Sequence, residues 1–375
     1  MKVYLDYATS TPVDKRVMKA MEVYLTEKYG SPSSSHYMGR EAAKAVEWSR
    51  DVIAKSIKCN PDEIFFTSGG TESDNLAIRG CARANQHLGN HIITSKMEHP
   101  PVLNTCYTLG QEGFDVTFLD ADKKGFVNPK DVEKNITKKT ILVTIQHANA
   151  EIGTIQNIAK IGKLCKKNRI IFHTDASQSF TKIPIDTKRM NIDMLTVSAN
   201  KIYGPKGIGA LFVRKGVKLK EQMIGGPQES GMRAGTQNVP GIVGFAKAAE
   251  ITNKEDVRKM EYIRDVLMND LLGIPETKLN GPMGKKRLCN NINISFNDVS
   301  AKSLVSYMDT KGIMVSSDIP VKSQFFNALS AIGLEEEEIA ESVRFSVGRD
   351  TTRKETDFTA KVVSELVEYL RKVEQ

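Results

Sequence analysis

Residues 170–201 read IIFHTDASQSFTKIPIDTKRMNIDMLTVSANK, and the fold class follows from this stretch. The apolar runs at 170–173 and 194–197 predict two buried strands, each followed directly by polar residues. Asp175 and Lys201 therefore come just past the carboxyl ends of strands, at the edge where open α/β sheets bind ligands. Taken singly, Asp175 is explained equally well as a helix N-cap and Lys201 as a surface lysine.

The same alternation of short apolar runs and helical patterns extends on both sides of this stretch, from about residue 60 to 215. It predicts further strands at 64–67, 92–94, 116–119, 141–145 and 210–213, with helix-length segments between most of them. Such a pattern is typical of an α/β protein with a mostly parallel, doubly wound sheet. Two amphipathic helices are expected ahead of it, around residues 17–25 and 42–53.

The pattern changes after about residue 255. A helix at 260–271, a strand at 291–296 and a closing helix at 358–370 predict a smaller α+β domain. We therefore expect an N-terminal arm over residues 1–14 associated with the small domain, a large domain over 15–255 and a small C-terminal domain over 256–375.

A glycine-rich turn follows the predicted strand at 64–67. It reads Ser68-Gly69-Gly70-Thr71 and leads into a helix. Glycines permit close backbone approach, and the free N–H groups of a helix start favour an anion, so the turn is a candidate phosphate cradle. A tight turn without a ligand explains this segment alone equally well. A phosphate cradle, a carboxylate and a lysine at one sheet edge are together what a pyridoxal phosphate (PLP) site needs.

Composition narrows the class of protein. The chain has 375 residues, 40% of them hydrophobic and 26% charged, which excludes disordered and collagen-like proteins. The net charge is +8, but the lysine pairs are scattered along the chain and do not alternate with aromatic residues, so we expect no nucleic-acid partner. No apolar run approaches the length of about 18 residues of a membrane span, and we expect a cytoplasmic protein without a membrane partner.

Neither the cysteines nor the histidines suggest a metal site. The five cysteines are widely spaced and form no CxxC pair, so neither a zinc site nor a disulfide framework is predicted. His87 and His91 have the i, i+4 spacing of helical metal ligands, but Gly89 between them argues against a helix. We expect no metal.

Nine segments together give the chain a specific resemblance. It resembles the cysteine desulfurase family of fold-type I PLP enzymes, which is class V aminotransferase-like, in the branch that serves iron–sulfur cluster assembly. The matching segments are YLDYATSTPVD (4–14), GSPSSSHYMGREA (30–42), FTSGGTESDNLAI (66–78), MEHPPVL (97–103), HANAEIGTIQ (147–156), HTDASQ (173–178), SANKIYGPKGIGAL (198–211), GGPQESGMRAGTQNVP (225–240) and VRFSVGRDTT (343–352).

The resemblance implies a PLP cofactor and assigns residues to its ring. Lys201 would form the internal aldimine, and Asp175 would keep the pyridinium nitrogen protonated. Gln178 would bond the ring hydroxyl oxygen, and His99 would stack on the ring and transfer protons. Without the surrounding motifs, His99 is more simply a helix-start or core histidine.

The resemblance also assigns the phosphate and the substrate. The phosphate would be held by Gly70, Thr71 and Ser198, with Thr236 reaching across from the second subunit of a homodimer. Asn200, beside Lys201, can also hydrogen-bond the phosphate but carries no charge. Arg344 would bind the substrate carboxylate through its planar fork of donors, although alone it is more simply a surface ion-pair former. Asn149 is the remaining amide of the family's substrate-binding motif.

Three departures from the family pattern fall on this site. The stretch GIMVSSDIPVKSQFFNAL from Gly312 contains no cysteine, whereas the family carries there a loop cysteine that accepts sulfur as a persulfide. The hydroxyls of Ser316 and Ser317 cannot replace a thiolate. Ala150 stands where the family has a second asparagine, and Asn200 stands where it has histidine.

Three functions remain open. The first is a desulfurase acting on L-cysteine or a close analogue, which mobilises sulfur for iron–sulfur cluster or thio-cofactor assembly and hands it to an external thiol or to an acceptor or scaffold protein. The second is another PLP reaction on the same scaffold, either C–S elimination or transamination. The third is a non-catalytic scaffold in cluster assembly, which the retention of Lys201 disfavours.

Overall fold

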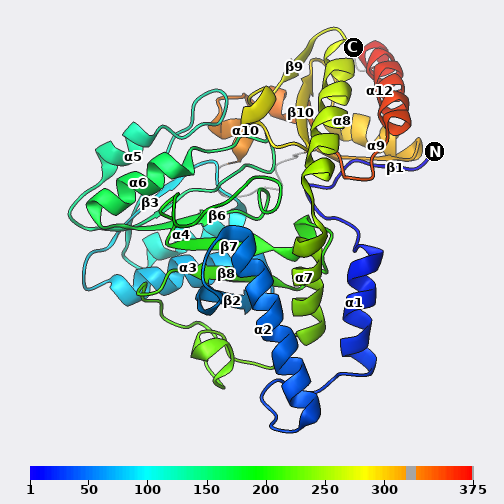
Figure 1. Ribbon diagram of the computed structural model, residues 1–375. Coiled ribbons are helices and arrows are strands. Elements are labelled where there is room, and N and C mark those ends of the chain that lie inside the picture. Colours follow the sequence, from blue (N-terminus) through cyan, green and yellow to red (C-terminus); the bar gives the residue numbers. More distant parts are fainter. Residues whose placement is uncertain (318–326, 374–375) are drawn as a thin grey trace.

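Seven strands form the central sheet of the computed structural model, which describes residues 1–317 and 327–373 (Figure 1). Their order across the sheet is β2 (Ile64–Thr67), β8 (Gly209–Val213), β7 (Met194–Ser198), β6 (Ile171–Asp175), β5 (Thr140–Thr144), β3 (His91–Ser95) and β4 (Asp115–Leu119). The strand β8 runs antiparallel to the other six strands of this sheet, which share one direction. The predicted strands are confirmed to within one or two residues.

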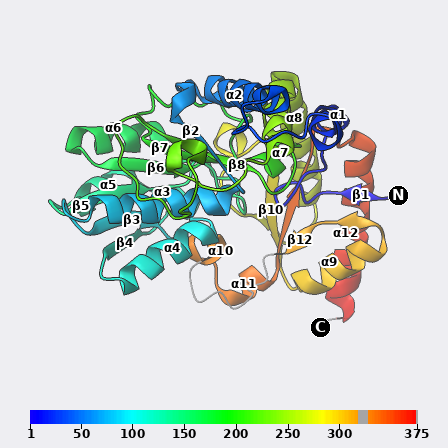
Figure 2. The ribbon, with the colours of Figure 1, turned by 90° about the horizontal axis from the view of Figure 1, so that it is seen from below.

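Helices cover both faces of this sheet, so the predicted doubly wound α/β fold is confirmed (Figure 2). One face packs against α2 (Tyr37–Ile57), α6 (Ile158–Asn168) and α7 (Val239–Ile251), with α1 (Lys15–Thr26) lying on α7. The other face packs against α3 (Gly70–Asn85) and α4 (Pro100–Gln111), while α5 (Pro129–Asn135) lies beside α6.

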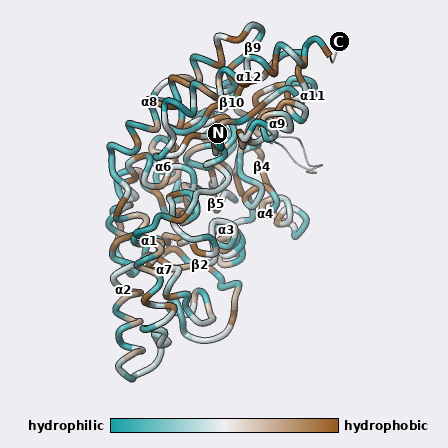
Figure 3. Tube along the Cα trace, turned by 90° about the vertical axis from the view of Figure 1, so that its right-hand side faces the viewer, coloured by the Kyte–Doolittle hydropathy of each residue, from teal (hydrophilic) through white to brown (hydrophobic). Residues whose placement is uncertain are grey.

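The hydrophobic pattern of the strands explains this two-sided packing. Successive strand residues point to opposite faces of a sheet. Leu142 accordingly packs in the cluster with α3 and α4, and Val143 packs in the cluster with α2 and α6. Each covering helix needs only one apolar face, and along α2 the trace in Figure 3 alternates between hydrophilic and hydrophobic residues.

A second, antiparallel sheet lies in the C-terminal part of the chain. Its strand order is β12 (Ser316–Ser317), β13 (Ser342–Ser346), β10 (Asn291–Phe296) and β9 (Thr277–Leu279). The helices of this part are α8 (Lys254–Leu272), α9 (Ala301–Thr310), α10 (Ala328–Ala331), α11 (Glu336–Ala340) and α12 (Arg353–Val373). The N-terminal β1 (Val3–Tyr4) pairs with β11 (Ile313–Met314), and Val3 and Leu5 pack in the core of this C-terminal part.

Within residues 1–317 and 327–373, no helix combines the length and the apolar character that crossing a bilayer requires.

Candidate active site

A cavity of about 290 Å³ opens where β6 and β7 end and α3 begins. Its volume is close to the lower end of ordinary ligand sites, about 300 to 1,000 Å³. Most of the site residues predicted from the sequence line it, namely Gly70, Thr71, His99, Asp175, Gln178, Ser198, Asn200 and Lys201. The cavity lining does not include Asn149, Thr236 or Arg344.

The start of α3 forms one end of the cavity. Gly69 has φ +152°, in the region that favours glycine, and a side chain at Gly70 would begin 3.2 Å from Ser177 Oγ. Because the first N–H groups of a helix have no partner within the helix, they are free to bind an anion. Ser198 also lines this space, and its hydroxyl donates to Asn200 Oδ1 at 2.6 Å. These donors suit a phosphate group.

Lys201 reaches the N-terminal arm. Its ammonium group donates to the carbonyl oxygens of Ala8 at 2.9 Å and Thr9 at 2.6 Å, and Gln178 Nε2 donates to the same Ala8 oxygen at 3.0 Å. The pKa of Lys201 is lowered, first because burial removes water from the cation and second because Arg344 lies nearby, while Asp175 opposes the shift. A lowered pKa makes the amine a better nucleophile near neutral pH.

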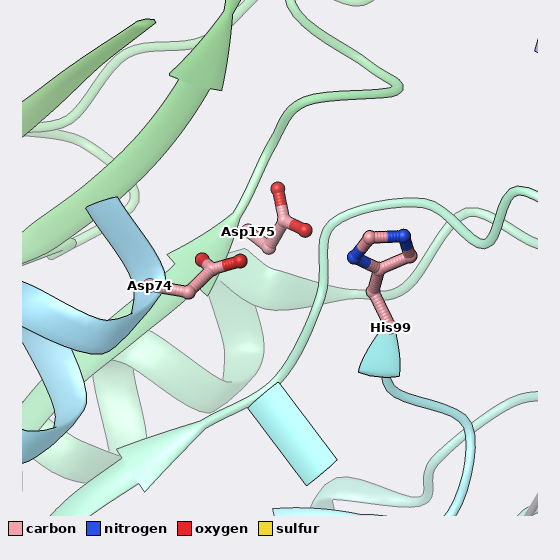
Figure 4. A group of neighbouring side chains, drawn as sticks. All are labelled: Asp74, His99 and Asp175. Atoms are coloured by element: carbon pink, nitrogen blue, oxygen red, sulfur yellow. The ribbon is translucent and has the colours of Figure 1, made fainter. Parts of the chain in front are cut away.

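Asp175 ends β6 at the floor of the cavity. The side chain is buried, and its Oδ1 accepts a hydrogen bond from the Ser177 N–H at 2.8 Å. His99 precedes α4, and its ring is exposed to the cavity opposite Asp175 (Figure 4). The pKa of His99 is lowered, chiefly because the cavity walls exclude water, while Asp175 opposes the shift.

The donor set fits PLP. The N–H groups at the start of α3 match its phosphate, the Asp175 carboxylate matches a protonated ring nitrogen, and the Lys201 amine matches its aldehyde carbon. Gly70 adds a steric argument, because a Cβ there would fill part of the cradle.

Arg344 comes from β13 in the other sheet and is already bonded. Its Nη1 donates to both carboxylate oxygens of Glu151 at 2.8 Å, and its Nη2 donates to Asp6 Oδ1 at 3.2 Å and Thr9 Oγ1 at 2.8 Å. Its charge shifts the pKa values of Lys201 and His99, so the guanidinium lies close to the cavity.

The side chain of Asn149 is already hydrogen-bonded to the backbone of neighbouring segments. Asn149 Nδ2 donates to the Met97 carbonyl at 3.0 Å, and its Oδ1 accepts from the N–H groups of Glu151 and Ile152. The next residue, Ala150, lines the cavity. The position at which the sequence lacks the family's second amide therefore faces the site.

Thr236 is exposed and lies away from the cavity lining. Exposed Met223 and Ile224 precede it in the same connection between β8 and α7.

Two buried carboxyl groups at the site were missed from the sequence. Glu98 accepts from Ser95 Oγ at 2.6 Å and from the Gln146 N–H with both oxygens, and burial raises its pKa to about 8. Asp74 lies on α3 and lines the cavity. The available signals were the position of Glu98 next to His99 and the four-residue spacing from Gly70 to Asp74, which places both on one helix face.

All five cysteines are free thiols with raised pKa values. Burial is the main cause in each case, and in Cys289 it raises the pKa to about 11 although Lys182 and Arg264 oppose the shift. Cys59 is partly buried and the other four are buried. A thiol with a raised pKa is a poor nucleophile at neutral pH. Part of the loop in which the family carries its acceptor cysteine, residues 318–326, lies outside the described residues.

A larger cavity, of about 580 Å³, lies at the opposite edge of the sheet. Lys166, Lys188 and Lys218 line it, although they are scattered in the sequence. Its carboxylate, Asp193, is paired with Arg214 at 3.0 Å. The lining of this basic cavity does not combine a lysine and a carboxylate at the carboxyl ends of strands, as a PLP site of this type requires. The expectation of no nucleic-acid partner stays a prediction.

Comparisons with known proteins agree on one family. A family model described as aminotransferase class-V matches residues 3–358. "Cysteine desulfurase IscS" of Dictyoglomus turgidum is 44% identical over 99% of this chain and 96% of its own length. Among solved structures, a NifS-like protein has a TM-score of 0.93 at 36% identity and covers 98% of this chain and 100% of its own. A structure described as SspA in complex with cysteine has a TM-score of 0.84 at 36% identity and covers 94% and 100%.

Proposed function

The chain belongs to the class-V aminotransferase family, and from that membership we propose that it is a PLP-dependent cysteine desulfurase. Its substrate is L-cysteine or a close analogue, and the sulfur that it mobilises serves iron–sulfur cluster or thio-cofactor assembly. The observation that carries the proposal is the single cavity that joins the start of α3, Asp175, His99 and Lys201. One of the similar solved structures is described as a complex with cysteine.

The cofactor end of the cavity has a residue for each group of PLP. Gly70, Thr71 and Ser198 would hold the phosphate, Asp175 would bond the ring nitrogen, and Lys201 would bond the aldehyde carbon. When bound, PLP acts as an electron sink that weakens the bonds around the α-carbon of an amino acid.

The chain's own residues bind the substrate and move protons. Arg344 binds the substrate carboxylate, which replaces the Glu151 carboxylate on Nη1. His99 is exposed to the cavity with a lowered pKa, so an uncharged imidazole is available to accept a proton. The lowered pKa of Lys201 likewise provides an amine that can take up and return a proton.

The sulfur acceptor is external to the chain. Residues 312–329 contain no cysteine, and the five thiols that the chain has are held protonated by burial. A persulfide forms on a thiolate, so a small thiol or a cysteine of an acceptor protein takes the sulfur.

The functional unit is a homodimer with two sites. Thr236 is exposed and outside the cavity of its own subunit, which leaves its hydroxyl available to the phosphate of the other subunit. Ile224 is 84% exposed in the same connection, and a subunit contact would remove this apolar surface from water. Sedimentation of the PLP-loaded protein at micromolar concentration should give a dimer, and a PLP-loaded monomer would refute this part.

One incubation tests the reaction itself. Purified protein is given PLP and L-cysteine, with and without dithiothreitol, and alanine, pyruvate, the sulfur-containing keto acid and sulfide are measured together. Alanine and sulfide in equal amounts, increased by the thiol, are expected. Pyruvate with sulfide indicates C–S elimination, a keto acid that retains sulfur indicates transamination, and no product from a PLP-loaded protein indicates a scaffold.

A further inference from the structure

Two carboxyl groups meet beneath the cavity, although they come from different elements. Asp74 lies on α3, one turn after the Gly70–Thr71 cradle, and Asp175 ends β6 (Figure 4). Asp74 is 1% exposed and Asp175 is 8% exposed. An oxygen of each and a ring nitrogen of His99 all lie within 4.8 Å of one another.

The two carboxyl groups have unequal surroundings. Asp175 accepts from the Ser177 N–H and borders the cavity. Among the residues that the structure describes, neither oxygen of Asp74 accepts a hydrogen bond of normal geometry, although the Thr196 hydroxyl lies close enough to oppose the rise of its pKa. A buried carboxylate that lacks well-formed hydrogen bonds is costly, whereas a hydrogen bond to the charged form favours it. A negative charge is therefore better placed on Asp175.

Among the described residues, no lysine or arginine forms an ion pair with Asp74. The nearest base is His173, whose Nε2 lies 3.7 Å from Asp74 Oδ1, beyond hydrogen-bond distance. The His173 ring is instead hydrogen-bonded to Thr144 and Thr196, and burial lowers its pKa to about 4, so the ring is uncharged at neutral pH.

We propose that Asp74 stays protonated in the folded protein and that Asp74 and Asp175 share one negative charge, carried by Asp175. Two carboxylates in one buried site repel each other, so one of them keeps its proton. Asp74 is then a positioning residue, because its uncharged carboxyl group supports the Asp175 anion without adding a second charge beneath the cofactor ring. This role rests on the proposed function, whereas the protonation of Asp74 does not.

The electrostatic surroundings agree with this geometry. Burial raises the pKa of Asp74 well above its usual value, the charge of Asp175 adds to the shift, and the Thr196 hydroxyl opposes it. Among the described residues, the titratable groups around Asp74 are Asp175 and His173 from β6, Glu98 and His99 from the segment before α4, and the buried Cys106 thiol from α4. Glu98 is a third buried acid with a raised pKa, so it does not neutralise the pair.

The position of Asp74 on α3 connects the Asp74–Asp175 pair with the phosphate cradle at the start of the same helix. Both ends of the cofactor would be held from α3, with the phosphate at its first turn and, through Asp175, the ring nitrogen at its second turn. An apolar residue at position 74 would leave Asp175 against a nonpolar wall, which disfavours its charged form.

The first test uses the cofactor-free protein, so that it does not depend on the proposed function. Asp74→Asn has nearly the shape of a protonated aspartic acid. A group whose pKa is raised on folding loses its contribution to stability as the pH rises above the unfolded value of about 3.9. The melting temperature of Asp74→Asn should therefore equal or exceed that of the wild-type protein at neutral pH, and the difference should grow toward alkaline pH. A variant that is less stable at neutral pH but matches wild type in acid would overturn the proposal.

The second test measures binding of PLP in the absence of substrate. Wild type, Asp74→Asn and Asp74→Leu are titrated with PLP at neutral pH, and the visible absorbance reports binding. We expect Asp74→Asn to bind PLP within about threefold of wild type and Asp74→Leu to bind about tenfold more weakly, comparable to the low end of the loss of about ten- to a hundredfold seen when hydrogen-bond partners of metal ligands are mutated. Equal weakening by both variants would show that Asp74 acts as an anion and would overturn the proposal. If Asp74→Leu does not fold, the test rests on Asp74→Asn alone. The visible absorbance spectrum of PLP-loaded Asp74→Asn at neutral pH must then match that of wild type.

Discussion

The proposed cofactor end and the proposed substrate end of the site are assembled in different ways. Asp175 and Lys201 follow two adjacent strands of one sheet, and the phosphate cradle follows a third strand of the same sheet. Arg344 comes from the other sheet and meets Glu151 and Asp6, which lie 193 and 338 residues away in sequence.

The departures from the family pattern follow this division only in part. The absent loop cysteine concerns the fate of the substrate sulfur. Ala150 and Asn200 both line the cavity, where Ala150 removes an amide expected near the cofactor and the substrate carboxylate, and Asn200 still accepts a hydrogen bond from Ser198. A site built on one sheet keeps its geometry when the loops change. A site that joins several segments can change its substrate or acceptor while the cofactor chemistry stays. Each prediction below tests one end against the other.

The largest effect is expected from Lys201→Ala. Without this amine the cofactor has no covalent anchor, so borohydride should fix no cofactor to the chain and turnover should fall at least about a thousandfold. Peptide mapping after reduction is the measurement. Lys206 lines the same cavity and provides the control, because Lys206→Ala should keep the label on Lys201. A label on Lys206 in the wild-type protein would contradict the assignment.

Arg344→Lys tests the substrate end separately. Lysine keeps the charge but loses the two-pronged geometry, so KM for L-cysteine should rise about tenfold while PLP affinity stays within about twofold. Glu151→Gln is the matched variant. It removes the carboxylate that occupies Arg344, and KM should fall. Equal KM values in wild type, Arg344→Lys and Glu151→Gln would show that Arg344 does not bind the substrate.

The prediction that the sulfur acceptor is external to this chain can be tested by mass spectrometry. Because burial raises the pKa of every cysteine, we expect no stable persulfide on this chain after treatment with L-cysteine. Sulfide release should depend on added thiol. The measurement is intact-protein mass spectrometry. An adduct of about 32 Da that is lost on reduction and maps to one cysteine would contradict the prediction. Cys289, which has the smallest of the five shifts, is the position to inspect first.

The smallest effect concerns the pH dependence of stability at the cofactor end. Glu98 has a pKa raised to about 8 by burial, with Asp175 adding to the shift. A raised pKa means that its contribution to stability is full below the unfolded value of about 4.3 and is lost as the pH rises to about 8. Glu98→Gln should therefore flatten the melting temperature of the cofactor-free protein between these pH values. Arg344→Lys, at the substrate end, should leave that dependence unchanged. An unaltered slope in Glu98→Gln would mean that Glu98 does not titrate in this range.

Several features were readable from the sequence because their causes are local. Apolar runs of strand length predicted the strands of the central sheet. Because adjacent parallel strands end at the same edge of a sheet, the positions of Asp175 and Lys201 at the ends of two such runs predicted that they lie close together. The glycines of the turn at 68–71 indicated the cradle because only they permit that backbone and that closeness. The family motifs supplied His99, Gln178 and Ser198, which line the cavity.

Only the tertiary structure decided which groups share an environment. Asp74 and Glu98 appear in the sequence as ordinary polar residues. Their pKa values are raised chiefly because α3 and the segment before α4 pack over the sheet and exclude water, and the nearby charge of Asp175 adds to both shifts. The contact between Arg344 and Glu151 requires both sheets to be in place. The basic cavity likewise gathers lysines that are far apart in the chain. A sequence specifies the chemistry of each side chain, but burial and charge proximity depend on distances between segments that only the folded chain fixes.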